Sequence, residues 1–345
     1  MTKKNKVALA LMVLLGLGIM LFSLRKVSLV ALVASFDDLK WGWLLVAFGV
    51  MFLSLAFEAT VVWLLVRKNH PAYPWLSALR VPLIEQLFNG ITPFATGGQP
   101  AQIFALAQSG VDVGRASSAM ILKFIVYQAM IVVNFIICLV LGFELVAAKI
   151  HALVWFLVFG FLIHLGVIVG LLMVMFWYDF TKKIVHLTLW PVKAWGHNSE
   201  KYARLCQVWD EKLASFYEEG QLLKRNKKLL WQMSGLTLVQ LALYYAIPYF
   251  ILLSLGIDHA NLVTVMVLHV LIVMVISLFP IPGGTGGAEY SFSMIFATFI
   301  SQAPKLVLAM LLWRFVTYYF GMTLGIVALM ISPKKSPTEK NSEKR

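Results

Sequence analysis

The chain has 345 residues, of which 60% are hydrophobic and 13% are charged, and its mean hydropathy is +0.83. A soluble domain does not carry such long uncharged runs, so the composition excludes a soluble globular protein and indicates a polytopic membrane protein. The net charge of +13 comes from Lys and Arg residues that lie between and beyond the apolar runs. This placement is typical of topology signals beside anionic lipid, and we expect no nucleic-acid partner.

The apolar runs predict an all-α fold. About 20 residues are needed to cross the hydrocarbon core as a helix. Six full crossings are predicted, at residues 7–24, 41–66, 120–143, 153–178, 229–255 and 305–331. Two further apolar segments, 77–106 and 271–301, are broken in the middle, and we predict them to be re-entrant hairpins. The prediction is therefore eight membrane segments within 1–331.

The positive-inside rule orients these segments. With the predicted topology, 22 of the 29 Lys and Arg residues fall on the inner side and five on the outer side. Both termini are therefore predicted to be cytoplasmic. Residues 179–228 are predicted to include an amphipathic helix on the cytoplasmic side, and 332–345 to be a disordered, basic cytoplasmic tail.

One short pattern occurs twice. The segments NGITPFATGGQP (89–100) and PIPGGTGGAEYS (280–291) share P-x-x-T-G-G. Three predicted crossings separate the two copies, which makes the two hairpins inverted relative to each other. Opposed broken helices are a transporter design with the substrate site between the repeats. The alternative is two unrelated tight turns.

The residue types of the two breaks suit a polar ligand. Irregular backbone in a bilayer must be buried in protein or line a wet cavity, and the amides at a helix start favour phosphate. The candidate binding residues in the two hairpin turns are Asn89, Thr96, Gly97, Gly98, Gln99, Thr285, Gly286 and Gly287.

Charged residues inside apolar segments are the second signal, because charge at membrane depth is costly. Glu58, Glu85, Glu289 and Arg314 are predicted to face the protein interior. Helix lengths place Glu289 and Arg314 at similar depth, so they could pair, either in a binding site or as a packing contact alone. Lys123, near the start of its predicted helix, is expected to extend toward the membrane surface.

The sequence predicts no metal site, no cofactor and no catalytic residue. No close grouping of His, Cys and carboxylates has metal-ligand spacing, and no nucleophile motif is present. His164 and His269 are expected to be packed and hydrogen-bonded within apolar helices. Cys138 and Cys206 imply no disulfide framework.

Three motifs together resemble a known family. They are N-x-x-T-P-x-x-x-G-G-Q-P from residue 89, P-x-P-G-G-x-G-x-x-E from residue 280, and W-R-x-x-x-Y-Y from residue 313. The chain, over roughly 7–331, resembles the membrane domain of the lysylphosphatidylglycerol synthase/flippase (multiple peptide resistance factor) proteins. The resemblance implies a multi-pass protein of the bacterial cytoplasmic membrane that moves aminoacylated phosphatidylglycerol to the outer leaflet. It also implies headgroup contacts by Glu58, Glu289 and Arg314.

The predicted function is therefore a lipid flippase, acting on an anionic phospholipid, an aminoacyl-phospholipid or a glycolipid. Two alternatives remain open: a membrane enzyme of the phosphatidylglycerol lysyltransferase type, and a proton-coupled transporter of a small solute. In the fused relatives a separate cytoplasmic domain makes the lipid, and we expect none within these 345 residues and hence no transferase activity. A separate lipid synthase and a second copy of the chain are the other candidate partners.

Overall fold

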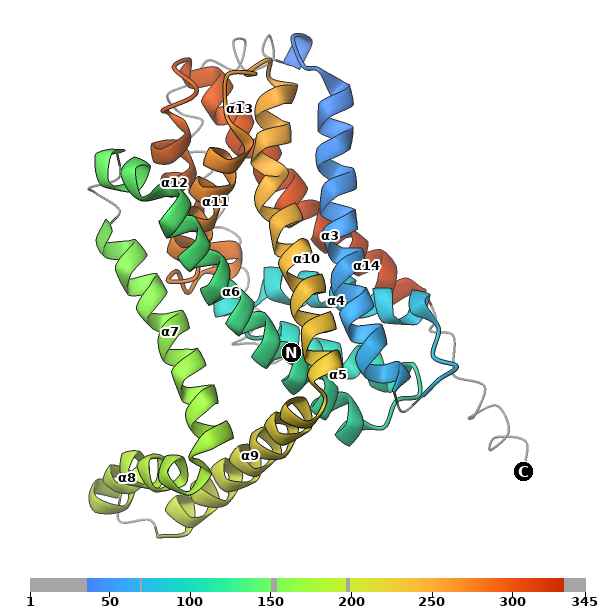
Figure 1. The fold of residues 1–345 in the computed structure, drawn as a ribbon, viewed down its shortest axis with the longest axis vertical. Coiled ribbons are helices and arrows are strands. Elements are labelled where there is room, and N and C mark those ends of the chain that lie inside the picture. Colours follow the sequence, from blue (N-terminus) through green and yellow to red (C-terminus); the bar gives the residue numbers. More distant parts are fainter. Residues whose placement is uncertain (1–35, 69, 150–153, 197–198, 332–345) are drawn as a thin grey trace.

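The computed structural model describes residues 36–331, apart from 69, 150–153 and 197–198. This part of the chain is helical and contains no β-strand, as the sequence predicts (Figure 1). Its elements are α3 (Trp41–Arg67), α4 (Trp75–Ile91), the 3₁₀ turn η1 (Pro93–Ala95), α5 (Gly98–Gln108), α6 (Val113–Lys149), α7 (Val154–Phe176), α8 (Tyr178–Gly196), α9 (Ser199–Arg225), α10 (Lys227–Ser254), α11 (Leu262–Ile276), the 3₁₀ turn η2 (Pro282–Gly284), α12 (Gly287–Phe296), α13 (Ala303–Arg314), the π-helix η3 (Phe315–Tyr319) and α14 (Phe320–Met330).

Within the described residues, five helical stretches are long and apolar enough to cross a membrane. They are Trp41–Arg67, Val113–Leu141, Val158–Phe176, Lys227–Ser254 and Ala303–Met330. These stretches correspond to five of the six predicted crossings, and the protein is therefore a multi-pass membrane protein. The predicted crossing at 7–24 and the predicted tail at 332–345 lie outside the described residues.

Helices α3 and α10 run side by side, with α10 near the middle of the view and α3 to its right (Figure 1). The Ser54 hydroxyl on α3 donates a hydrogen bond to the backbone oxygen of Gln240 on α10, at 3.0 Å. Met51 on α3 and Ile247 on α10 are fully buried in the same apolar core. Between membrane helices, close packing and such interhelical hydrogen bonds drive association, because lipid is as apolar as the side chains.

Two helix–turn–helix units lie where the sequence predicts hairpins. In the first, α4 and α5 pack against each other across η1; in the second, α11 and α12 pack across η2. The turns η1 and η2 also contact each other, although 189 residues separate their prolines. The breaks of the two units therefore lie next to each other, although Phe94, Ala95 and Thr96 of the first break are exposed.

The two residues that follow the proline of the repeated pattern have similar φ angles in both turns. After Pro93, Phe94 and Ala95 have φ angles of 52° and 54°. At the matching positions after Pro282, Gly283 and Gly284 have φ angles of 65° and 61°. These left-handed angles cost little at glycine but roughly 1–2 kcal/mol at a residue with a Cβ atom. The first turn thus contains local strain that the second avoids.

The threonine of the pattern has the same role in both copies. Its hydroxyl donates a hydrogen bond to the carbonyl oxygen of the proline three residues earlier, at 3.0 Å for Thr96 and 2.9 Å for Thr285. The backbones diverge at the threonine itself, where ψ is −18° for Thr96 and 138° for Thr285, and Gly97 and Gly286 then have φ angles of −77° and 92°. The two copies are equivalent up to the threonine, which favours a true repeat over unrelated turns.

The polar segment 179–228 forms two helices, where the sequence analysis identified one. Figure 1 shows α8 and α9 together at one end of the molecule, beyond the ends of α7 and α10. Leu213 on α9 is buried because α9 packs against α7 and α8. Exposed apolar side chains lie on both helices, at Phe180, Ile184, Leu187 and Trp190 of α8 and at Val208 and Trp209 of α9. The cytoplasmic placement of residues 179–228 remains a prediction.

Helices α8 and α9 are joined by an ion-pair cluster centred on Asp210 of α9. Its carboxylate lies 3.0 Å from Lys182 Nζ and 2.8 Å from His186 Nε2, both on α8. Partial burial would raise the pKa of Asp210, but the contacts with Lys182 and His186 lower it by more, so it lies below its ordinary value.

Candidate functional site

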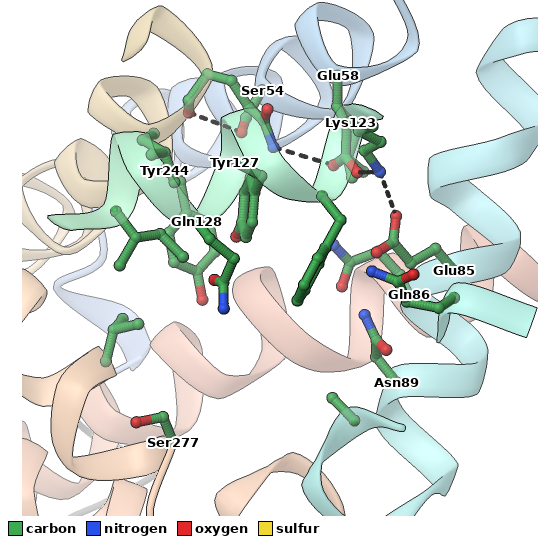
Figure 2. A pocket seen from close by; sticks show the side chains of 18 of the residues that line it. Ser54, Glu58, Glu85, Gln86, Asn89, Lys123, Tyr127, Gln128, Tyr244 and Ser277 are labelled. Carbon is green, nitrogen blue, oxygen red and sulfur yellow. Dashed lines mark hydrogen bonds and ion pairs between the residues drawn. The ribbon is translucent and has the colours of Figure 1, made fainter. Parts of the chain in front are cut away.

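A cavity of about 440 Å³ lies among the membrane helices (Figure 2). Helices α3, α4, α5, α6, α7, α10 and α11 and the turn η1 all contribute lining residues. Four of the predicted site residues are part of this lining: Glu58, Glu85, Asn89 and Gln99. A cavity of this size is typical of small-ligand sites, which take roughly 300–1,000 Å³.

Lys123 on α6 joins the two acidic residues of the cavity. Its ammonium contacts the carboxylate of Glu58 on α3 and lies 2.8 Å from Glu85 Oε2 on α4. It also lies 3.2 Å from Gln102 Oε1 on α5. Lys123 is only 7% exposed, so the prediction that it extends to the membrane surface is wrong. Helix α6 begins at Val113, which places Lys123 deeper than the sequence analysis assumed.

Glu58 is held from a second side. Gln240 on α10 donates a hydrogen bond from Nε2 to Glu58 Oε2, at 3.0 Å. Figure 2 shows this chain of contacts from Ser54 through Glu58 and Lys123 to Glu85. We call Glu58, Glu85, Gln102, Lys123 and Gln240 the Lys123 network. It connects five helices, and its hydrogen bonds offset the cost of burying the charges.

Neutral polar and apolar side chains together line the rest of the cavity. In Figure 2 the amides of Gln86, Asn89 and Gln128 and the phenol of Tyr127 face the open space beside the network. Amides both donate and accept hydrogen bonds, so this lining can replace water around a polar group. The cavity therefore combines a charged end with an adaptable polar wall, inside an otherwise apolar bundle.

The two buried histidines differ. Trp313 Nε1 donates to His269 Nε2 at 3.0 Å, and His269 Nδ1 lies 3.3 Å from the backbone oxygen of Tyr245. His269 is thus packed and hydrogen-bonded, as predicted, with its proton on Nδ1. His164 on α7 lines the cavity, and neither of its ring nitrogens has a hydrogen-bond partner in the described structure. The prediction that His164 is hydrogen-bonded is wrong.

Glu289 and Arg314 form the ion pair that helix lengths suggested. Arg314 Nε lies 2.7 Å from Glu289 Oε1, and Arg314 Nη1 donates to the backbone oxygen of Gly283 at 2.8 Å. Glu289 Oε2 in turn accepts a hydrogen bond from the backbone N–H of Gly286, at 2.6 Å. Both side chains therefore secure the turn η2 and the start of α12.

The three residues expected to contact the lipid headgroup do not lie together. Glu58 belongs to the Lys123 network, whereas Glu289 and Arg314 lie at η2 and are not part of the described cavity lining. The interpretation of Glu58, Glu289 and Arg314 as one headgroup site is therefore corrected to two separate clusters.

The glycines of the two motifs allow the chain to pack against itself. A Cβ atom at Gly98 would collide with the side chain of Asn89, and one at Gly97 would lie 2.6 Å from Thr92 Cγ2. A Cβ atom at Gly287 would collide with the ring of Phe279. Gly97, Gly98, Gly286, Gly287, Thr96 and Thr285 are all absent from the described cavity lining. Their hydrogen bonds and close contacts shape the turns, and a ligand role for them stays a prediction.

Sequence reasoning missed the residues that complete the network: Lys123, Gln102 and Gln240. A signal for them was present, because a charged or amide side chain in a membrane helix indicates function by default. The grouping was not readable, because it depends on which helices become neighbours. Among the described residues, no group of three or more His, Cys, Asp or Glu could hold a metal ion.

The fold and site define a polytopic helical membrane protein with a charged network beside a central cavity. The family model described as "Lysylphosphatidylglycerol synthase TM region" matches residues 7–325, and the chain belongs to this family. It is also similar to a "UPF0104 membrane protein" of Archaeoglobus fulgidus, with 27% identity over 320 residues. That similarity covers 88% of this chain and 90% of the relative.

Proposed function

We propose that this protein is a lipid flippase, which moves the headgroup of a membrane lipid between leaflets through the central cavity. The observation that carries the proposal is the 440 Å³ cavity, lined by the Lys123 network and by side-chain amides, among membrane-spanning helices. A bare lipid headgroup crosses the hydrocarbon core slowly because its polar groups lose water without replacement. The cavity supplies replacement partners while the acyl chains remain in lipid.

In this proposal the two helix–turn–helix units act as opposed re-entrant hairpins. Their equivalent turns and the contact between η1 and η2 support an inverted-repeat arrangement, the geometry that alternating-access transporters use around a central site. The strained Phe94 and Ala95 of η1 line the cavity, so a movement of this turn changes the cavity directly. Both termini are proposed to lie in the cytoplasm.

The family description supports a phospholipid as substrate, including aminoacyl-phosphatidylglycerol made by a separate synthase. Such a lipid carries a phosphodiester anion and one or two amines. The Lys123 network offers complementary groups for both signs of charge, an ammonium and two carboxylates. A glycolipid would instead use the amides of Gln86, Asn89 and Gln128.

The test is lipid exchange in reconstituted vesicles. We expect vesicles that contain the full chain to expose inner-leaflet fluorescent phosphatidylglycerol to a membrane-impermeant quencher, and protein-free vesicles to keep it protected. The variant Gln128→Leu removes a cavity amide without breaking an ion pair and should slow exchange. Arg204→Gln, an exposed position on α9, is the matched control and should exchange like the parent. Protection of the inner leaflet in vesicles with correctly folded parent protein would contradict the proposal.

A second candidate function is proton-coupled transport of a small solute. It is favoured by the sharing of one ammonium between two carboxylates, since such a cluster can take up a proton. The measurement is the pH inside vesicles in which the protein exchanges no lipid. Proton movement into these vesicles on addition of a solute would support this candidate over the flippase.

A further inference from the structure

We propose that Lys123 binds the phosphodiester of the translocated lipid, and that proton uptake by Glu58 or Glu85 releases Lys123 for that purpose. This inference rests on the proposed function in one respect, that the cavity admits a lipid headgroup. It adds the identity of the anion-binding residue and a link between lipid binding and proton uptake.

The position of Lys123 carries the first step. It is a buried cation that lines the cavity, and its ammonium is aimed at the carboxylates of Glu58 and Glu85. In the described structure these two anions occupy two of its three hydrogen-bonding directions, and Gln102 occupies the third at 3.2 Å. An incoming phosphodiester can contact the ammonium only by displacing one of these partners.

Charge balance carries the second step. With all three groups ionised, Lys123, Glu58 and Glu85 together hold one net negative charge. A phosphodiester would add a second negative charge in a buried site, which is unfavourable at low effective dielectric. Uptake of one proton by a carboxylate restores the original charge and converts that carboxylate into a neutral acid. The neutral acid no longer competes for Lys123.

The surrounding groups favour Glu58 and Glu85 as the proton acceptors. The other titratable groups in the described cavity lining are Tyr127 on α6, His164 on α7 and Tyr244 on α10. The hydrogen-bond partners of the ammonium among the described residues are Glu58, Glu85 and Gln102, so both carboxylates touch it and the three other titratable groups do not. Helix α11 and the residue after it, Ser277, add only uncharged residues to the lining, such as Met274.

Gln240 and Gln102 make the exchange reversible. Gln240 holds Glu58 from α10, and Gln102 lies beside the ammonium from α5. When a carboxylate is protonated, these amides can keep its side chain in place, because they accept as well as donate hydrogen bonds. The network can then re-form once the lipid leaves.

Binding of a short-chain lipid to the purified full chain tests this inference without transport. The probes are dihexanoylphosphatidylglycerol, dihexanoylglycerol as the analogue without phosphate, and inorganic phosphate. Of the three probes, we expect only dihexanoylphosphatidylglycerol to bind. Its binding should be stronger in mildly acidic than in alkaline buffer and should be accompanied by uptake of about one proton per lipid. Calorimetry in two buffers of different ionisation enthalpy measures that proton. Equal binding of inorganic phosphate would assign the site to free phosphate and overturn the lipid reading.

Variants identify the residues. Lys123→Gln alone strands two carboxylates and can fail to fold, so the decisive variant is Lys123→Gln combined with Glu58→Gln. We expect the double variant to bind the lipid about tenfold or more weakly than the parent, since a charge-assisted contact is lost. Glu85→Gln should bind at least as tightly as the parent and with a weaker dependence on pH. Arg115→Gln, exposed on the same helix, is the control and should leave both binding and proton uptake unchanged.

The outcomes separate the two proposals. Parent-like binding by the folded double variant would overturn the role of Lys123, and binding without proton uptake would overturn the coupling. Binding with proton uptake in a protein that does not exchange lipid in vesicles would support the site and contradict the flippase.

Discussion

Tyr318 in η3 donates a hydrogen bond from its hydroxyl to the backbone oxygen of Gly90 in α4, at 2.7 Å and across 228 positions of the chain. The same ring lies against Gly283 of η2, where a Cβ atom would come within 2.5 Å of Tyr318 Cε2. One side chain of the last span therefore contacts both helix–turn–helix units. This contact makes Tyr318 a test of whether the two units work together.

We expect Tyr318→Phe to leave the ring against Gly283 and to remove only the hydrogen bond to Gly90. The loss should cost about 1 kcal/mol of stability, because the Gly90 carbonyl is left with one partner fewer. If the two units move together, lipid exchange should fall by more than this small change in stability explains. Thermal unfolding in detergent and vesicle exchange measure the two effects. Tyr319→Phe, at a neighbouring position that is 47% exposed, is the control.

The ion pair of Glu289 and Arg314 makes a prediction about stability. Removal of one partner, as in Glu289→Gln, leaves a buried charge and should cost roughly 3–5 kcal/mol. The double change to Gln at both positions should recover part of that loss. Arg314→Lys should remain destabilised, because a single ammonium cannot bond both Glu289 and the Gly283 carbonyl as the guanidinium does. Thermal unfolding of the three variants is the measurement. A double variant less stable than both single variants would contradict this account.

The strain in η1 predicts a stabilising substitution. Ala95 has a φ of 54° and is exposed, so Ala95→Gly removes an unfavourable backbone angle without losing buried contacts. Relief of roughly 1–2 kcal/mol exceeds the entropic cost of the added glycine, about 0.4–1 kcal/mol, so the melting temperature should rise. Ala107→Gly, within α5, is the matched control and should lower it. A fall in both variants would remove the argument for strain.

The predicted topology can be tested by cysteine labelling. A cysteine at Ala203 on α9 should react with impermeant reagents only from the cytoplasmic side, and one at His259, before α11, only from outside. Both positions are exposed, and neither side chain caps a helix. The background should carry Cys206→Ser, because Cys206 is only half-buried whereas Cys138 is buried. Labelling of both positions from one side would eliminate the inverted arrangement.

The Asp210 cluster predicts a response to acid that is separate from the cavity. Its carboxylate has a lowered pKa in the folded protein, so it stabilises the α8–α9 contact above its ordinary pKa of about 3.9. That stabilisation is lost only as the pH falls through the lower, folded value. The protection factors of the α8 amides, which correct for the intrinsic pH dependence of exchange, should therefore be constant between neutral and mildly acidic pH and should fall in stronger acid. Asp210→Asn should show lower protection at neutral and mildly acidic pH and should match the parent in stronger acid.

The described membrane-spanning helices could be predicted from the sequence, because each is a long apolar run that can be recognised without knowing which helices pack against it. The sequence was sufficient for the Glu289–Arg314 contact because short helices and one turn connect the two residues, so their depths follow from counting. The presence of a turn in both copies was also readable, since proline ends a helix locally. The left-handed angles of the first turn were not readable, because they fall on Phe94 and Ala95 rather than on glycine.

The Lys123 network was not readable, for two physical reasons. Lys123 lies ten residues after the start of α6, or about 15 Å into the helix, whereas the apolar pattern placed the helix start at 120. Its partners also come from three other helices, and no pattern along one chain segment specifies which helices pack together. The family resemblance implied headgroup contacts by Glu58, Glu289 and Arg314 together, but Glu58 contacts Lys123 whereas Glu289 contacts Arg314.

The π-helix η3 has a consequence for the whole last span. A π-helical turn accommodates one residue more than an α-helical turn, and each residue advances the helix by about 100°. The five residues Phe315–Tyr319 thus offset the faces of α13 and α14, so that Arg314 meets η2 while α14 packs on α4. Deletion of one residue from η3 would restore α-helical register and rotate the two ends relative to each other. Only one of the two helix–turn–helix units could then keep its contact, either η2 with Arg314 or α4 with α14.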